Sequence, residues 1–209
     1  MRVQTNMGPL ITEKRLPELI RESLRDRTPQ VIEDKGSLLR HAAVLIPLFQ
    51  DGNEYRILFT RRTQMVEAHK GQISFPGGRI DEKDRSLLET ALREAYEEIG
   101  LRRKDVDVLG RTDDMRTVAS NYIVHPFVGF IPGSYSFVIN KDEVEKLITV
   151  PFRVFMENGT VMPVNYEGGA YEGLAYTYDG EVIWGATARI MHNLVNIVRE
   201  KSVLPPGSA

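Results

Sequence analysis

The spacing of apolar and polar positions along the chain predicts alternating strands and helices. Apolar residues recur at helical intervals in residues 16–27, which predicts a short amphipathic helix. Two β-rich runs follow, HAAVLIPLF and EYRILFTRR, and the turn residues at 50–53 between them predict a hairpin. We expect a long loop, rich in glycine and polar residues, from about residue 63 to residue 85.

The second half of the chain alternates in the same way. Strands are predicted at DVDVLGR, YIVHPFVGFIP and SYSFVIN, followed by a short charged segment at KDEVEKLI and a short helix at PFRVFMEN. Another hairpin is predicted where GLAYTY and EVIW flank Asp179 and Gly180, and ATARIMHNLVNIVRE predicts a closing helix. Strands before and after an embedded helix indicate a mixed sheet with helices on its faces, so we predict an α/β layered domain.

The helix predicted over residues 87–99 concentrates three carboxylates. Glu94, Glu97 and Glu98 project within an arc of roughly 100°. Like charges at this spacing cost a helix about 0.2–0.5 kcal/mol per pair unless a cation lies over them. A solvated acidic face is the ordinary explanation. Here an apolar stripe runs beside the glutamates and indicates that they border buried surface; it consists of Leu88, Leu92, Ala95 and Ile99.

The two ends of this helix are also marked in the sequence. Ser86 and Glu89 form a capping-box pattern at its start, and Gly100 is a C-terminal stop signal. The helix is therefore well delimited. A divalent cation is the natural counter-charge for its acidic patch, because Mg²⁺ and Mn²⁺ prefer oxygen ligands and Mg²⁺ keeps positions open for water and substrate phosphates.

Composition excludes several other kinds of site. The chain has 209 residues and a net charge of −2, which gives no reason to expect a nucleic-acid partner. It has no cysteine, so disulfides, thiolate catalysis and cysteine-bound zinc or iron–sulfur clusters are excluded. The sequence shows no secretory signal and no apolar stretch of membrane-spanning length, so we expect a cytoplasmic protein without a membrane partner.

A glycine-rich loop, FPGGR at 75–79, directly precedes the acidic helix. Paired glycines let the backbone approach a helix or a ligand more closely than a Cβ would allow. Together with REAYEEIGL at 93–101, this loop resembles the box of the Nudix hydrolases, written G, five residues, E, seven residues, R-E-U-x-E-E-x-G-U, with U a bulky aliphatic residue. The first half departs from that box, because the spacing from Gly78 to Arg93 is one residue longer and Arg85 stands where the early glutamate would be.

The longer spacing resembles the coenzyme A diphosphatase subgroup of that family. Two further segments resemble the subgroup's motifs: LFTRRT at 58–63 with HKGQISFPGG at 69–78 upstream, and IWGATAR at 183–189 downstream. The resemblance covers roughly residues 40–200 and implies a Nudix-type α/β/α sandwich with a mixed β-sheet. We accordingly expect three parts: an N-terminal helical extension at 1–38, a Nudix hydrolase domain at 39–200 and a flexible tail at 201–209.

The resemblance implies metal-assisted hydrolysis of a diphosphate, with Mg²⁺ or Mn²⁺ as cofactor. Glu94 and Glu98 are the first candidate metal ligands, and Glu97 is a further ligand or the group that orients or deprotonates water. Arg93 is expected to pair with a neighbouring carboxylate and to fix the loop against the helix. Glu143 is a candidate second base outside the box, with an exposed helix-capping acid as the alternative.

Candidate substrate-binding residues come from the upstream motif and the glycine loop. Guanidinium groups bind phosphate oxygens bidentately, although any single basic residue is also explained as a surface charge. In HKGQISFPGG two polar side chains alternate with Ile73 and Phe75, so one pair can face a ligand while the other faces the core. The candidates are Arg61, Arg62, His69, Lys70, Gln72, Ser74, Gly77 and Gly78.

The motifs favour coenzyme A or a derivative as substrate, cleaved to 3′,5′-ADP and 4′-phosphopantetheine or its acyl form. Phe59 and Thr63 depart mildly from the subgroup, and Glu67 stands where many members have arginine. These departures leave open another nucleoside diphosphate derivative, such as ADP-ribose, a dinucleotide polyphosphate or a nucleoside triphosphate. A non-catalytic nucleotide-binding module is a further alternative, and the sequence leaves a homodimer open.

Overall fold

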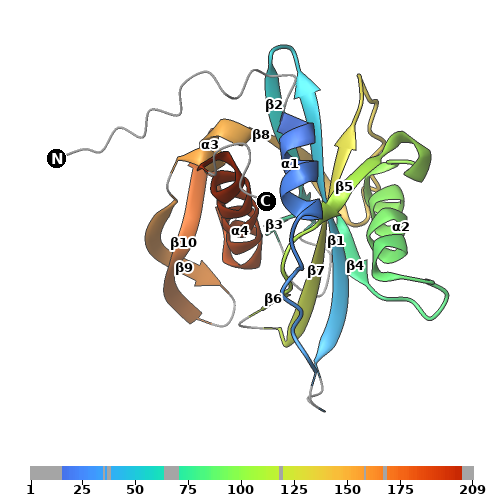
Figure 1. The fold of residues 1–209 in the computed structure, drawn as a ribbon. Coiled ribbons are helices and arrows are strands. Elements are labelled where there is room, and N and C mark those ends of the chain that lie inside the picture. Colours follow the sequence, from blue (N-terminus) through green and yellow to red (C-terminus); the bar gives the residue numbers. More distant parts are fainter. Residues whose placement is uncertain are drawn as a thin grey trace.

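The computed structural model describes most of the chain, and Figure 1 shows the arrangement of its elements. It describes residues 16–34, 36, 39–63, 71–117, 120–157, 159–166 and 169–203. The helices are α1 (Leu16–Arg25), α2 (Leu87–Ile99), the 3-10 helix η2 (Arg103–Asp105), α3 (Phe152–Met156) and α4 (Gly185–Val203). The strands are β1 (Arg40–Asp51), β2 (Glu54–Arg62), β3 (Ile73–Ser74), β4 (Gly77–Arg79), β5 (Asp107–Arg111), β6 (Met115–Arg116), β7 (Tyr122–Ile131), β8 (Val144–Pro151), β9 (Thr160–Tyr166), β10 (Gly169–Tyr178) and β11 (Glu181–Trp184).

The main sheet is mixed, as the sequence predicted. Within the described residues it has eight strands on the path β3-β2-β1-β7-β5, with β4 also paired to β1, β6 to β7 and β8 to β2. Strands β1 and β7 run parallel, whereas β2 pairs antiparallel with β1, β3 and β8. A separate sheet consists of β9, β10 and β11.

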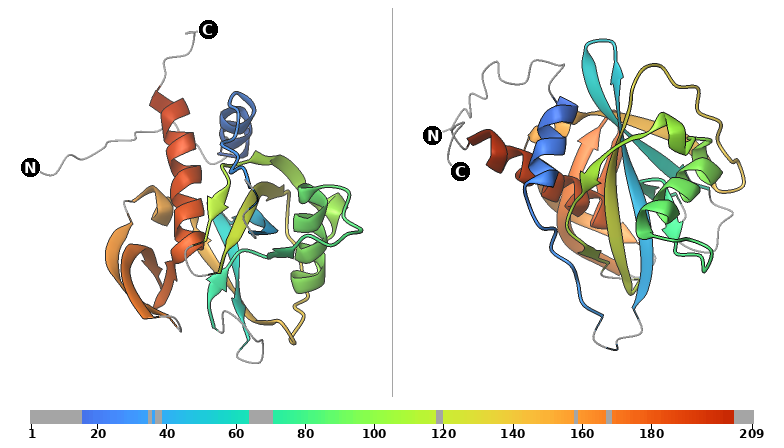
Figure 2. Two further views of the ribbon diagram at one scale, coloured as in Figure 1. Left: turned by 90° about the horizontal axis from the view of Figure 1, so that it is seen from below. Right: turned by 45° about the vertical axis from the view of Figure 1, so that its right-hand side comes forward.

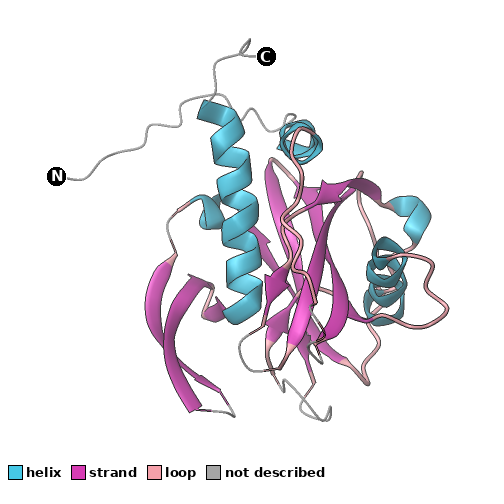
Figure 3. Cartoon of the chain, turned by 60° about the horizontal axis from the view of Figure 1, so that its bottom comes forward, coloured by secondary structure: helices cyan, strands magenta, loops and turns pink. Residues whose placement is uncertain are grey.

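Helices cover both faces of the main sheet. In Figure 1, α2 lies on one side of the sheet, and α1 and α4 lie on the other. Figures 2 and 3 show α4 between the main sheet and the smaller sheet. On β2, Leu58 belongs to the apolar cluster under α2, whereas Phe59 belongs to the larger cluster that includes α4. Successive β2 side chains therefore serve opposite faces, as the two-residue period of a strand requires.

Helix α1 is the amphipathic helix predicted near the N-terminus, and it ends at Arg25. Its apolar stripe, Leu16, Ile20 and Leu24, is buried in the same cluster as α4. Burying each such side chain contributes roughly 1.5–3 kcal/mol. A Cβ on Gly110 of β5 would lie 2.8 Å from the Cβ of Leu24, so this glycine permits the close approach of α1 to the sheet. Helix α1 is thus part of the core.

Both predicted hairpins are confirmed. The β1–β2 register pairs Asp51 with Glu54, and Gly52 between them has a φ of 60°. The β10–β11 register pairs Tyr178 with Glu181, and the two residues between them, Asp179 and Gly180, have φ values of 50° and 75°. Positive φ at both central positions is the requirement of a type I′ turn, whose twist matches that of the strands.

Helix α2 has the predicted bounds. The Ser86 hydroxyl accepts a hydrogen bond from the Glu89 backbone N–H at 3.2 Å, which is the first half of the predicted capping box. The Glu89 carboxylate accepts from the backbone N–H of Arg85 instead of that of Ser86, so the reciprocal half is shifted by one residue. Gly100 ends the helix in the left-handed conformation with a φ of 68°.

The strand predicted at SYSFVIN is wrong, because residues 134–140 form no strand. Their hydrogen bonds go to the C-terminal end of α2 instead of to another strand. The Tyr135 hydroxyl donates to the Gly100 carbonyl at 2.8 Å, and the Val138 backbone N–H donates to the Ile99 carbonyl at 3.0 Å. Side chains Tyr135, Phe137 and Ile139 pack against the cluster under α2. The β-like composition thus reflects burial against the end of a helix.

Other boundaries also differ from the prediction. The expected loop at 63–85 contains the short strands β3 and β4, and the charged segment at 141–148 contains a turn followed by the start of β8. Strand β9 was not predicted. The short helix α3 is present, and the closing helix α4 extends to 19 residues. Among the described residues, no helix is long and apolar enough to cross a membrane.

Candidate active site

The glycine loop lies directly against the acidic helix, as its paired glycines predicted. Strand β4 pairs with β1 through Gly77 and Gly78, which places the loop between the sheet and α2. A Cβ on Gly78 would lie 2.5 Å from Cδ of Glu94, and a Cβ on Gly77 would lie 2.5 Å from the Ala43 carbonyl oxygen. Position 77 therefore has no room for a side chain against the β1 backbone, whereas a side chain at position 78 would have to displace the Glu94 carboxylate.

Glu98 is the most deeply buried carboxylate of α2, with a relative exposure of 2 %. Its Oε1 lies 3.7 Å from Nη1 of Arg62, and its buried Oε2 has no hydrogen-bond partner within the described part of the chain. Burial raises the pKa of Glu98 to about 8, against the opposing effect of Arg62. The carboxyl group is therefore largely protonated at neutral pH unless a second cation approaches it.

Glu94 and Glu97 lie at different depths. Burial raises the pKa of Glu94, and the nearby positive charge of Arg93 opposes that rise. The Glu97 side chain is half exposed. Nη1 of Arg93 donates to Oε1 of Glu94 at 2.8 Å and to Oε2 of Glu97 at 2.9 Å, so one guanidinium bridges both carboxylates.

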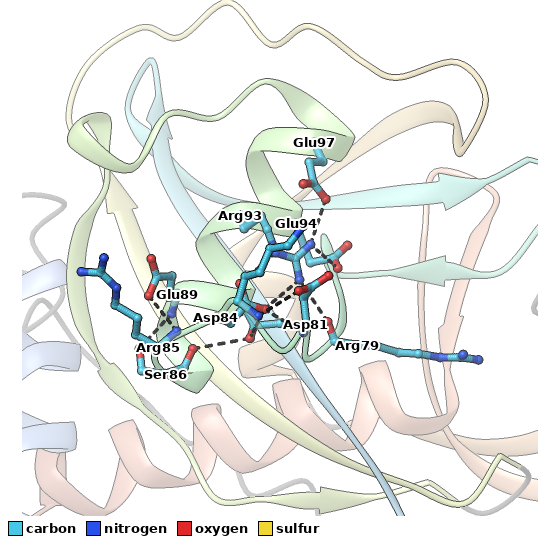
Figure 4. Close-up of polar contacts among 11 residues, drawn as sticks. Arg79, Asp81, Asp84, Arg85, Ser86, Glu89, Arg93, Glu94 and Glu97 are labelled. Atoms are coloured by element: carbon cyan, nitrogen blue, oxygen red, sulfur yellow. Dashed lines mark hydrogen bonds and ion pairs between the residues drawn. The ribbon is translucent and has the colours of Figure 1, made fainter.

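Arg93 also joins the helix to the loop before it (Figure 4). Its Nε and Nη2 donate to the two carboxylate oxygens of Asp84, each at 2.9 Å, and Nη2 also donates to the Arg79 carbonyl at 3.1 Å. The hydrogen bonds from Arg93 hold the pKa of Asp84 far below its usual range. The pairing predicted for Arg93 is thus present, and it fixes residues 79–84 against α2.

Asp84 is a site residue that the sequence reasoning missed. Its buried carboxylate also accepts a hydrogen bond from the Thr90 hydroxyl at 2.8 Å, inside the first turn of α2. The signal was present, because an acidic residue stands two positions before the helix cap Ser86. The neighbouring Arg85, and not Asp84, occupies the place of the early glutamate in the family box.

Glu143 lies at the same carboxylate cluster. It occupies the turn before β8 instead of a helix end, and its Oε1 accepts a hydrogen bond from the Asn140 side chain at 3.2 Å. Its negative charge contributes to the raised pKa of both Glu94 and Glu98. The structure therefore brings the candidate second base into electrostatic contact with the helix carboxylates.

Arg61 and Arg62 point to different partners. Arg62 lies near Glu98 on α2, whereas Arg61 forms an ion pair with Glu181 of β11, on the other side of the main sheet. The β2–β8 register shifts between these two residues. Only Arg62 therefore reaches the helix carboxylates directly.

The rest of the upstream motif is only partly described. Ile73 and Phe75 are buried in the core, and the alternate residues Gln72 and Ser74 are half-buried, so the predicted alternation is confirmed. The Ser74 carbonyl and hydroxyl lie within 3.5 Å of the Thr60 hydroxyl. The candidates His69 and Lys70 lie outside the described residues.

The donor set fits a hard divalent cation. Its members are carboxylates, one of them with an unpartnered buried oxygen and a raised pKa, and such groups gain most from a nearby positive charge. Within the described residues, no three acidic or histidine side chains already converge as metal ligands. Glu94 and Glu97 are instead paired with the guanidinium of Arg93.

Comparison with solved structures supports the fold. The chain is similar to a MutT/nudix family protein from Enterococcus faecalis, with a TM-score of 0.52, 13% identity, and coverage of 92% of this chain and 75% of that chain. It is also similar to a MutT protein from Methanosarcina mazei Go1, with a TM-score of 0.50, 14% identity, and coverage of 85% and 99%. These likenesses confirm the predicted α/β fold with its mixed sheet.

Sequence comparison identifies the family. The NUDIX domain family model matches residues 39–160, which include the glycine loop and α2. Two relatives, both named uncharacterized Nudix hydrolase NudL, are 37% identical to this chain. The one from Photorhabdus laumondii aligns over 77% of this chain and 86% of its own length, and the one from Yersinia pestis over 76% and 80%. The chain therefore belongs to the Nudix family and is a Nudix hydrolase.

Proposed function

We propose that this Nudix hydrolase cleaves the diphosphate bond of coenzyme A or its derivatives, giving 3′,5′-ADP and 4′-phosphopantetheine or its acyl form. One observation carries the proposal: the motif that resembles the coenzyme A subgroup is physically part of the carboxylate site. Its strand β2 brings Arg62 to Glu98, and its glycine loop brings Gly78 to Glu94. The upstream motif, which favours coenzyme A among the possible substrates, and helix α2, which supplies the carboxylates, thus belong to one site.

The helix carboxylates are proposed to hold Mg²⁺ or Mn²⁺, in keeping with the general use of divalent ions by Nudix hydrolases. Glu94 and Glu98 are the first ligands and Glu97 is the next. Diphosphates are kinetically inert because their negatively charged oxygens repel a nucleophile. When bound, the ion would neutralise this charge. Arg62 lies beside Glu98, and its guanidinium can bind an oxygen of the same diphosphate.

The proton of the attacking water is assigned to a carboxylate. The water oxygen forms a bond to one phosphorus, the bridging P–O bond breaks, and the other phosphate leaves with the bridging oxygen. Glu97 is half exposed and can accept the proton at the rim of the site, and Glu143 is the second candidate base. Arg93 acts as a positioning residue, since its hydrogen bonds to Asp84 and Glu94 hold the loop against the helix.

A different nucleoside diphosphate derivative is the alternative substrate. Two of the departures that motivated it have structural explanations. Phe59 is fully buried and its ring packs at a tilt against those of Phe75 and Phe155, with ring centroids 5.0 and 5.8 Å away. Thr63 is buried, and its hydroxyl donates to the Asp142 carbonyl in the turn that carries Glu143. These two residues therefore give little support to a substrate other than coenzyme A.

The experiment is a rate panel with purified protein and Mg²⁺ or Mn²⁺. Coenzyme A, acetyl-coenzyme A, ADP-ribose, a dinucleotide polyphosphate and a nucleoside triphosphate are compared by kcat/KM, because specificity is a ratio of these values. The proposal expects the coenzyme A compounds to lead. A faster reaction with ADP-ribose contradicts the substrate assignment, and an unchanged rate in a Glu98→Gln variant contradicts the metal site.

A further inference from the structure

Glu181 binds two cations on the side of the main sheet away from α2. It forms an ion pair with Arg61 of β2, and its Oε1 accepts from Nζ of Lys146 of β8 at 2.7 Å. Glu181 is the first residue of β11, so it reaches the main sheet from the β10–β11 hairpin. The three residues form a charge cluster, Arg61–Lys146–Glu181, that the carboxylate site does not use.

Strand pairing makes the two cations of this cluster neighbours. Arg61 and Lys146 are direct partners in the β2–β8 register. Like charges placed directly opposite on neighbouring strands repel, so an anion between them is stabilising. The strands thus present a pair of cations whose charge is only half balanced by the single carboxylate of Glu181.

Part of the Arg61 guanidinium is also unused. Its Nε is buried and has no hydrogen-bond partner in the part of the chain that the structure describes. A groove of about 260 Å³ adjoins the cluster; Lys146, Tyr178, Glu181 and a second acidic residue, Asp179, are among the residues that line it, and Arg61 is not. A phosphate monoester has more charge and more acceptor oxygens than a carboxylate, so it can satisfy both cations more fully.

We infer that Arg61 and Lys146 form a second anion subsite that takes a phosphate monoester of the substrate, and that Glu181 competes with this phosphate. The inference rests on the proposed function for the identity of the ligand: coenzyme A carries a 3′-phosphate monoester in addition to its diphosphate, and dephospho-coenzyme A lacks it. Arg61 and Arg62 then divide the work, with Arg62 at the diphosphate and Arg61 at the monoester. Glu181 sets the preference between the two substrates.

Opposite effects of two substitutions test the subsite. Removing the competing charge in Glu181→Gln is expected to lower KM for coenzyme A by about two- to fivefold and to leave KM for dephospho-coenzyme A unchanged. Removing a cation in Lys146→Gln is expected to raise KM for coenzyme A by a similar factor, again without effect on dephospho-coenzyme A. The kcat values are expected to stay within about twofold of the wild type.

Asp26→Asn is the matched control, because Asp26 also joins two cations, Arg25 and Lys201, and none of these three residues lines the groove. It is expected to change neither KM. An unchanged or raised KM for coenzyme A in Glu181→Gln, or equal changes for both substrates, overturns the subsite. If Glu181 only holds the β10–β11 hairpin against the main sheet, Glu181→Gln should lower the melting temperature without lowering KM for coenzyme A.

A binding measurement separates this inference from the proposed function. If the wild type cleaves neither compound, the proposed function fails, and calorimetric titration with 3′,5′-ADP and 5′-AMP still tests the subsite. The subsite predicts tighter binding of 3′,5′-ADP than of 5′-AMP, and a loss of that difference in Lys146→Gln. Equal affinities of the wild type for the two nucleotides overturn it. Should Glu181→Gln not fold, Lys146→Gln alone decides, since Lys146 is half exposed.

Discussion

The backbone of Gly78 lies against the carboxylate of Glu94, so closely that a Cβ would come within 2.5 Å of Cδ and of Oε2. This contact ties the glycine loop to the acidic helix at the atoms that are proposed to hold the metal ion. The neighbouring atoms are the far end of a flexible side chain, so a larger residue would displace the carboxylate more easily than the backbone. The site is therefore more sensitive to this position than the fold is.

Gly78→Ala is expected to lower kcat/KM by at least about tenfold, because it moves a proposed metal ligand away from its position. The melting temperature should fall only slightly, since Glu94 can rotate away. Gly52→Ala is the control, because Gly52 has a φ of 60° in a hairpin turn and no neighbouring atom within 4 Å. It should cost roughly 1 kcal/mol of stability through backbone strain and leave kcat/KM unchanged. The reverse pattern would contradict the role of the close contact.

Glu98→Gln is expected to abolish activity and to stabilise the metal-free protein at pH 8. The pKa of Glu98 is raised from 4.5 to about 8 on folding, so between these values the folded state holds a proton that the unfolded state has lost. The wild type therefore loses up to about 1.4 kcal/mol of unfolding free energy per pH unit across this window. Glutamine removes this dependence.

Thermal unfolding in EDTA measures the effect of Glu98→Gln. The variant should melt above the wild type at pH 8, and the difference should disappear near pH 4, where the wild-type carboxyl is protonated in both states. A variant that melts below the wild type at pH 8 would show that Glu98 is ionised and stabilising without metal.

Divalent ion binding is expected to release protons. Because the pKa of Glu98 is about 8, its carboxyl must lose a proton at pH 7 to become a ligand. Apparent affinity for Mn²⁺ should then rise with pH up to about pH 8. Calorimetric titration at pH 7 in buffers with different ionisation enthalpies counts the protons, and the count should approach one per ion. No proton release would exclude a protonated Glu98 as ligand.

Asp84→Asn is expected to lower stability by about 2–3 kcal/mol at pH 7, because it breaks a buried two-bond pair with Arg93. The pKa of Asp84 is lowered on folding, so its contribution is present above the unfolded value of 3.8 and is lost as the pH falls through the folded value. Denaturant unfolding from pH 7 downwards should therefore show the wild type approaching the variant. Asp107→Asn, which removes an exposed ion pair to Arg21, should change stability by less than about 1 kcal/mol. Equal losses in both variants would contradict the assignment.

Local signals were enough for much of the fold. The ends of α2 follow from Ser86 and Gly100, and the hairpin at Asp179 and Gly180 follows from turn residues, because these features depend on neighbours in the chain. The segment around Val138 has the composition of a strand but packs on a helix end, and composition alone does not distinguish the two environments.

The candidate site divides in the same way into features that local sequence predicts and features that it does not. The carboxylates of α2 and the close approach of Gly78 followed from spacing and from the lack of a side chain. The separation of Arg61 from Arg62, and the place of Glu181 beside Arg61, depend on sheet alternation and on a hairpin 120 residues away. Asp84 was missed because its partner, Arg93, is reached only through the fold of the loop. Long-range pairing carries no local signal, so the ion pair of Arg61 with Glu181 required the structure.

The proposed activity of this Nudix hydrolase is cleavage of coenzyme A at its diphosphate. Its most direct test is chromatography of the products after coenzyme A is incubated with purified protein and Mg²⁺ or Mn²⁺, with Glu98→Gln as the parallel control. We expect equal amounts of 3′,5′-ADP and 4′-phosphopantetheine from the wild type and none from the variant. Intact coenzyme A at high enzyme concentration, under conditions in which the same sample hydrolyses ADP-ribose, would contradict it.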